Sequence, residues 1–195
     1  MISLNENDKI ATGSERACYI HPHDSTKIIK IVYQQSQTTN QNTLEYKYYK
    51  ELEKQGITYS HLPKCYGFVE TNLGQGLVFD YIINYDGTPA PTLRNAILHK
   101  KITQDEELNL LHDLKTYVDN NQILFRDATT VNVMYTEIAP HIYRLIIIDG
   151  LGPRRENFKF FLYKYVTPYL TYKIKKQWKV FLHNVQRSKT QVLDK

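Results

Sequence analysis

The chain has 195 residues, of which 42% are hydrophobic and 23% charged, a balance that excludes an intrinsically disordered protein. This length fits one domain, or two small lobes that share a cleft. The net charge of +5 is uneven, because residues 154–195 carry a net +9 and the residues before them −4. Such a basic tail favours polyanions as partners without choosing among them.

The chain opens with strand-like segments. Residues 9–19 and 26–32 are rich in β-forming side chains and flank a His-Pro-His-Asp-Ser turn, which predicts an antiparallel pair. The polar run at residues 34–42 is typical of a surface loop.

A helix is predicted after this loop. Its apolar stripe is formed by Leu44, Tyr48 and Leu52. Asn42, with Glu45 three residues later, has the spacing of a capping box, and Gly56 ends the pattern. Residues 65–70 and 77–83 are again strand-like, and the glycine-containing segment between them suits a hairpin.

The second half of the chain is mainly helical. A helical period begins at Thr92, and Thr103 with Glu106 forms a second capping-box pattern. The stripe that follows consists of Leu108, Leu111, Leu114 and Val118. Residues 131–136 and 143–148 then predict two short strands around a turn.

The tail predicts a basic amphipathic helix, which Pro168 separates from an earlier helix over residues 158–165. Its apolar positions are Ile174, Trp178, Phe181, Leu182 and Val185. The lysines between them could contact an anionic surface such as a membrane face or nucleic acid. A packed helix with a solvated lysine face is the favoured interpretation over nucleic-acid binding, because packing already accounts for Trp178.

Two segments close together in the chain have the residue types expected for phosphoryl transfer. The first is FRDATTVN at residues 125–132, and the second is IIIDG at 146–150. This is the order of the catalytic and metal-binding loops of protein kinases. Asp127 would accept the proton of the attacking hydroxyl, and Asn132 and Asp149 would hold Mg²⁺ through hard oxygen atoms. Taken singly, each of these residues also fits an ordinary turn.

A lysine-bearing strand lies upstream, in KIIKIV at residues 27–32. Residues two apart share a face of a strand, so Ile28 and Lys30 together would offer an apolar contact to adenine and an ammonium to phosphates. Lys27 is the alternative, but it would place Ser25 in the apolar position. We therefore predict Lys30, with ATP as its ligand.

A carboxylate on the following helix should hold this lysine extended. Glu45 is the preferred partner, Glu51 and Glu53 are rivals, and Glu45 could instead serve only as the capping-box acid. The loop at residues 10–18 occupies the place of a phosphate-covering hairpin. Its nucleotide-contacting candidates are Gly13, Ser14 and Arg16, and a plain hairpin turn is the alternative.

Four segments resemble the YrbL family, in family order over about residues 9–155: GSERACYIHPHD at 13–24, LPKCYG at 62–67, GLVFDYI at 76–82 and YDG at 85–87. The resemblance implies a minimal protein-kinase-like α+β fold. Residues 1–83 would form an antiparallel β-sheet lobe with one helix, and residues 84–195 a reduced helical lobe. It also implies that Phe79 precedes a hinge at Asp80–Ile82, with Ile82 against the nucleotide, and that Met134 contributes to the adenine floor.

Departures from the kinase pattern bear on the substrate. Phe125 replaces the usual histidine, Gly150 replaces the phenylalanine of the metal-binding triplet, and no Ala-Pro-Glu motif follows. A peptide platform is therefore not expected, and the acceptor is predicted to be a sugar, a lipid-linked group or a small molecule. A pseudokinase without phosphotransfer is the alternative. No signal peptide or membrane span is predicted, which favours the cytoplasm, and Cys18 and Cys65 show no disulfide or zinc pattern.

Overall fold

The structure is a computed structural model that describes residues 1–33, 40–152 and 167–193. It forms two compact units. The first comprises residues 1–57 and 63–81, and the second comprises residues 58–62 and the described residues from Ile82 onward. The division at Tyr81 stands two residues before the boundary predicted at residue 83, and no feature of the sequence predicts that residues 58–62 belong to the second unit.

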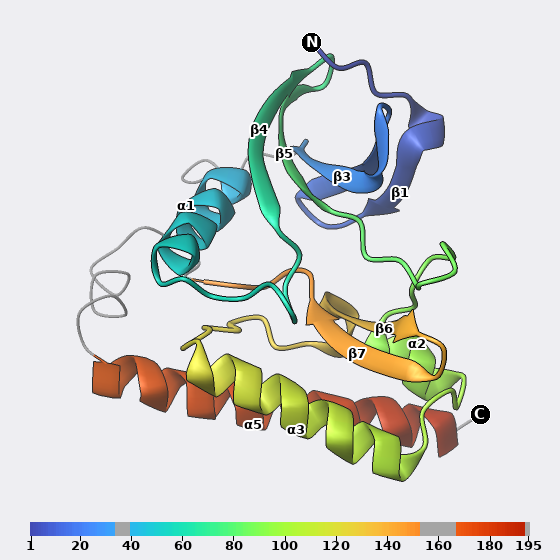
Figure 1. Ribbon diagram of the computed structural model, residues 1–195, viewed down its shortest axis with the longest axis vertical. Helices are drawn as coiled ribbons and strands as arrows, with labels where there is room; N and C mark the ends of the chain where they lie inside the picture. The colour runs from blue at the N-terminus through green and yellow to red at the C-terminus, as the bar shows by residue number, and fades with distance from the viewer. Residues whose placement is uncertain (34–39, 153–166, 194–195) are drawn as a thin grey trace. The chain divides into compact units, whose positions relative to one another are not determined.

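The first unit is a five-stranded antiparallel sheet in the order β1-β2-β3-β5-β4, with one helix beside it (Figure 1). Its elements are η1 Glu6–Asp8, β1 Lys9–Thr12, β2 Arg16–His21, β3 Asp24–Val32, α1 Gln41–Lys54, β4 Cys65–Thr71 and β5 Gly74–Asp80. The strand predicted over residues 9–19 is wrong as a single element, because the chain reverses after Thr12 and pairs β1 with β2.

The two faces of β3 have different neighbours, as the two-residue period requires. Ile29 and Ile31 are buried in an apolar core that also contains Tyr19 and Val78. Ile28 and Lys30 therefore point to the opposite face, which they share with the β5 residues paired with them.

Helix α1 begins earlier than its capping-box pattern predicted. The Asn40 side chain caps it by accepting hydrogen bonds from the N–H groups of Asn42 and Thr43. The prediction that Asn42 and Glu45 form the cap is therefore wrong, which leaves the Glu45 carboxylate available for another partner. As predicted, the helix ends before Gly56, which has a φ of 68°.

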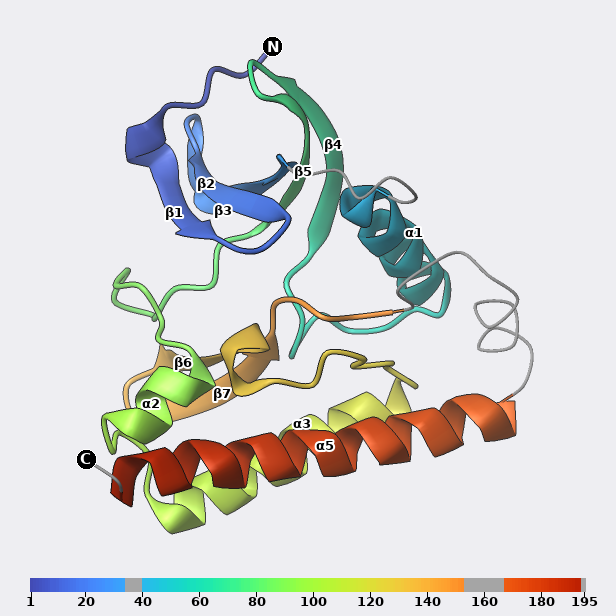
Figure 2. The same ribbon diagram turned by 180° about the vertical axis from the view of Figure 1, so that it is seen from behind.

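The second unit joins helices to a two-stranded antiparallel sheet. Its elements are α2 Leu93–Leu98, α3 Gln104–Asn120, η2 Thr130–Asn132, β6 Val133–Ala139, β7 Ile142–Ile147 and α5 Thr167–Leu193. Figure 2 shows α3 and α5 side by side, with α2 beside the C-terminal part of α5. The Thr103 half of the capping box predicted for α3 is confirmed, since its hydroxyl accepts from the Glu106 N–H at 3.3 Å. The Glu106 carboxylate instead accepts from the Tyr135 hydroxyl at 2.8 Å.

The apolar stripe predicted for helix α5 is confirmed at Ile174, Phe181 and Val185, which are buried. It is wrong at Leu182, which is exposed because it follows Phe181 by one residue and so lies about 100° around the helix. Pro168 lies in its first turn, where the missing N–H costs no hydrogen bond. The helix predicted over residues 158–165 lies outside the described residues. None of the described helices has both the length and the apolar character needed to cross a membrane. The predicted α+β class, an antiparallel N-terminal sheet with a mainly helical C-terminal part, is confirmed.

Candidate functional site

Lys30 forms a buried ion pair with helix α1. Its Nζ atom lies 2.8 Å from Oε1 of Glu45, and both side chains are less than a tenth exposed. The same ammonium lies 4.4 Å from the centroid of the Phe79 ring. A charge removed from water is stable only when it is paired and hydrogen-bonded. The pair therefore fixes the lysine at one place on the sheet.

Glu45 carries a second cation on its other carboxylate oxygen. Oε2 accepts from the Arg16 guanidinium, which also donates to the Asn42 side chain at 3.3 Å. The rival acids have other partners, since Glu51 pairs with Lys54 and Glu53 pairs with Lys50.

The face of the sheet around Lys30 is apolar and half-buried. Ile28 lies opposite Phe79 on β5 and opposite Ile20 on β2, and Cys18 lies opposite Lys30. Sequence reasoning identified Ile28 but missed Ile20 and Cys18. The two-residue period of β2 was the available signal. Ala17 and Tyr19 face the core, so Cys18 and Ile20, which alternate with them, lie on the opposite face. The alternative lysine, Lys27, pairs instead with Asp24.

Gly13 and Ser14 lie in the turn that joins β1 to β2. The Gly13 N–H donates to the Arg16 carbonyl at 2.8 Å, and both turn residues are exposed. The hairpin is therefore closed tightly by backbone bonds while its tip stays open to solvent. Arg16 leaves this turn toward Glu45.

The residues predicted around the adenine base fall in both units. Phe79 is fully buried, and Asp80 ends β5 with its carboxylate accepting from the Tyr66 hydroxyl at 2.8 Å and from the Lys64 N–H at 2.7 Å. Ile82 and Met134 belong to the second unit and are half-buried there.

In the second unit Asp127 and Asn132 are locked together. The Asn132 amide nitrogen donates to the Asp127 carbonyl at 2.9 Å and to its carboxylate at 3.0 Å. Because both Asp127 oxygens can only accept, this fixes the amide orientation and leaves the side-chain oxygen Oδ1 of Asn132, a hard oxygen atom, without a hydrogen bond to the described residues. The Asp127 N–H in turn donates to the Gly150 carbonyl at 3.0 Å.

Gly150 makes this arrangement possible. Its φ is 78°, and a Cβ atom built on it would lie 2.8 Å from the Asp127 Cβ and carbonyl oxygen and 3.0 Å from the Asn132 amide nitrogen. A larger residue does not fit here. The phenylalanine of the kinase pattern would therefore not fit at this position.

The side-chain oxygen atoms of Asn132 and Asp149 are of the chemical type that binds Mg²⁺. Asp149 follows β7, and its Oδ1 atom accepts from the Gly150 N–H at 2.7 Å, which orients the carboxylate. Mg²⁺ is commonly held by one or two carboxylates together with substrate phosphates. The described residues contain no cluster of three His, Cys, Asp or Glu side chains. Binding of Mg²⁺ through Asn132 and Asp149 stays a prediction.

Helix α5 supports the loop between Asp127 and Asn132. The Asn184 side chain donates to the Ala128 carbonyl at 2.7 Å, and the hydroxyls of Thr130 and Ser188 lie 3.0 Å apart. Phe125, at the position of the usual histidine, is buried in edge contact with Phe181. Sequence reasoning missed Asn184 and Ser188, whose spacing of four residues on the buried side of α5 was the available signal.

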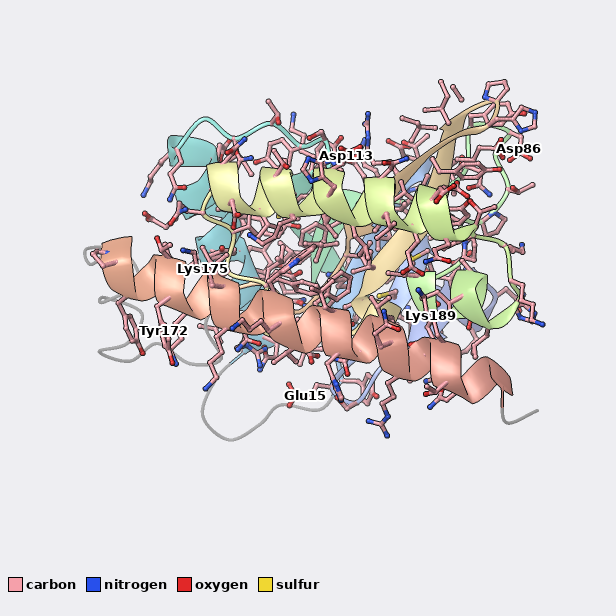
Figure 3. All side chains as sticks on the ribbon, turned by 90° about the horizontal axis from the view of Figure 1, so that it is seen from below. Glu15, Asp86, Asp113, Tyr172, Lys175 and Lys189 are labelled. Atoms are coloured by element: carbon pink, nitrogen blue, oxygen red, sulfur yellow. The ribbon has the colours of Figure 1, made fainter. Side chains whose placement is uncertain are left out.

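The basic side of α5 is exposed at Lys175, Lys176 and Lys179. Figure 3 shows Lys175 and Lys189 on this helix, and Lys189 pairs with Glu107 of α3 at 2.6 Å. Trp178 packs beside Phe181, with ring centroids 5.2 Å apart, as the packed-helix interpretation requires. Contact of this helix with an anionic surface stays a prediction.

The segment 58–62 is hydrogen-bonded to β7 and α3 within the second unit. His61 Nδ1 lies 2.7 Å from the Leu145 carbonyl oxygen, and the His61 carbonyl accepts from the Ile147 N–H at 3.0 Å. The Tyr117 hydroxyl donates to the Thr58 carbonyl at 2.6 Å. Burial lowers the pKa of His61, so its ring is neutral at pH 7 and donates through Nδ1–H.

The chain is similar in sequence to one protein family and in structure to a solved kinase domain. Residues 2–186 match the family described as PhoP regulatory network protein YrbL. The YrbL proteins of Escherichia coli (strain K12) and Shigella flexneri are each 32% identical over 155 residues, which cover 78% of this chain and 74% of theirs. Among solved structures, a double-mutant PknI kinase domain of Mycobacterium tuberculosis is similar with a TM-score of 0.48 and 12% identity, over 76% of this chain and 58% of that one.

Proposed function

The chain belongs to the YrbL family, and we propose that it is a Mg²⁺-dependent ATP phosphotransferase that acts on a non-peptide acceptor. The observation that carries the proposal is the buried Lys30–Glu45 pair, with its Nζ–Oε1 distance of 2.8 Å. A strand lysine held by a helix glutamate is the device by which protein kinases place a cation on the nucleotide phosphates. A buried ion pair is a poor source of stability, so a structural role alone accounts for it less well.

Each residue then has one task in the transfer. Lys30 neutralises phosphate charge, and Asp127, oriented by Asn132, accepts the proton of the attacking hydroxyl. Asn132 and Asp149 would hold Mg²⁺, whose chemistry is to neutralise the charge that develops on the phosphate oxygens. The apolar face with Ile20 and Ile28 would contact the adenine ring.

Thermal shift with nucleotides tests binding directly. ATP at about 100 times its Kd stabilises a protein by about 2.7 kcal/mol, which corresponds to a Tm increase of roughly 5–11 °C for a chain of this size. Because Lys30 is proposed to contact the phosphates and Asp149 to hold the metal, Lys30→Met and Asp149→Asn should each remove the Mg²⁺-dependent increase. Lys27→Met is the matched control on the same strand and should keep it. An equal response in Lys27→Met and Lys30→Met would refute the assignment of Lys30.

A pseudokinase is the second candidate. It is favoured by the Arg16 contact on Glu45, which places a second cation on the carboxylate that positions Lys30, and by Phe125 in the place of a histidine. The two candidates differ in turnover. Labelled phosphate should appear on an acceptor from a pool of sugars, lipid headgroups and small alcohols if the chain is a transferase. Saturable ATP binding without transfer or hydrolysis, unchanged by Asp127→Asn, would instead establish the pseudokinase.

A further inference from the structure

The second unit contains a pocket of about 250 Å³ on the side of the Asp127–Asn132 loop where α2, η2 and α5 meet. Figure 2 shows these helices converging near the C-terminal part of α5. Arginine, hydroxyl and amide side chains supply the polar lining that the described residues give it: Arg94, Arg187, Thr129, Thr130, Ser188, Asn184 and Gln191. No carboxylate is among the described residues that line it. These residues give the pocket two positive charges and several hydrogen-bond donors.

The two arginines differ in the hydrogen bonds that their guanidinium groups form with the described residues. Arg94 donates one hydrogen bond to the Gln191 side chain at 3.1 Å, which orients its guanidinium. Its other N–H groups can donate to a ligand. Arg187 is exposed, and its guanidinium has no hydrogen-bond or ion-pair partner among the described residues. A guanidinium presents a planar fork that matches the oxygen atoms of a phosphate or carboxylate.

Thr129 also lines the pocket, but its Oγ1 atom is buried, so we assign the contacts with an anion to the two arginines. The neighbouring wall is rigid, because the Thr130 and Ser188 hydroxyls lie 3.0 Å apart and Asn184 holds the Ala128 carbonyl.

We propose that this pocket binds a phosphate group, either free phosphate or the phosphate of a small phosphomonoester. Its volume is below the roughly 300–1,000 Å³ of sites that enclose drug-sized ligands, so it suits a small anion better than a nucleotide. Thr129 and Thr130 stand in the chain between Asp127 and Asn132, so the bound anion contacts the loop that carries both proposed catalytic groups. Lys30 is not among the described residues that line this pocket, and the proposal does not depend on the proposed transferase activity.

Titration with inorganic phosphate tests the proposal, at constant ionic strength and without Mg²⁺, followed by calorimetry and by ³¹P line broadening. The wild-type chain should bind saturably. Arg187→Gln and Arg94→Gln should each weaken binding by about tenfold or more, since each removes a charge-assisted hydrogen bond. Lys179→Gln, which removes the same charge from an exposed position of α5 outside the pocket, should bind as wild type does.

Three outcomes would overturn the assignment. They are no saturable binding by the wild-type chain, equal weakening in Arg187→Gln and Lys179→Gln, and loss of binding in Lys30→Met with full binding in Arg187→Gln. Parallel titration with glycerol 3-phosphate separates the two sources of the ligand. Tighter binding than inorganic phosphate assigns a phosphomonoester, and weaker binding assigns the free anion. Both arginines are exposed, so their replacement is not expected to unfold the chain, and circular dichroism checks this.

Discussion

Replacement of Gly150 by alanine tests the loop that carries the proposed base and metal ligands. The new Cβ atom would stand 2.8 Å from the Cβ and carbonyl oxygen of Asp127, a distance that real Cβ contacts do not reach. The φ of 78° is itself unfavourable for alanine by about 1–2 kcal/mol. Overpacking adds about 1–3 kcal/mol. The total of about 2–5 kcal/mol corresponds to a Tm decrease of roughly 4–20 °C for a chain of this size.

Gly87→Ala is the matched control for this prediction. Gly87 lies in the same unit with a φ of 84°, but nothing lies within 4 Å of a Cβ atom built on it. It should therefore show only the backbone cost, a Tm decrease of roughly 2–8 °C. The difference between the two variants isolates the steric clash with Asp127 and Asn132.

Differential scanning fluorimetry, with and without Mg²⁺ and ATP, measures both consequences. Gly150→Ala should lose the nucleotide-dependent increase in Tm, because Asp127 and Asn132 must move, and Gly87→Ala should keep it. If Gly150→Ala is no less stable than Gly87→Ala and responds equally to nucleotide, the packing described for this loop is wrong.

Two further predictions concern buried charge. Glu45→Gln leaves the Lys30 and Arg16 cations without their carboxylate and should lower the free energy of unfolding in urea by about 3–5 kcal/mol. Glu53→Gln, at an exposed ion pair, should change it by less than about 1 kcal/mol. Equal effects of the two variants would contradict the buried pair. Burial lowers the pKa of His61, so the unfolded chain binds more protons below about pH 6.5 and stability should fall as pH falls through that value. His61→Gln should flatten this decline and exposed His99→Gln should not, and an unchanged slope in His61→Gln would exclude His61 as its source.

Local patterns predicted much of the fold. The two-residue period of β3 distinguished Lys30 from Lys27, and the structure places Ile29 and Ile31 in the core as that period requires. The Thr103 cap and the apolar stripe of α5 depend on neighbours within a turn or two, and the structure contains the cap and every stripe position except the exposed Leu182. The capping-box prediction for α1 was wrong because Asn40, two residues earlier, offered the same chemistry.

The sequence by itself determined the order of the elements and the kinds of chemical group they carry, because backbone period and capping act between residues close in the chain. Only the tertiary structure decided which groups meet. In the structure Lys30 pairs with Glu45 and not with Glu51 or Glu53, and Gly150 lies against Asp127. The tertiary structure also brought α2, η2 and α5 around one basic pocket. These contacts join residues far apart in the chain, so burial and packing of the whole unit set them, and no local spacing encodes them.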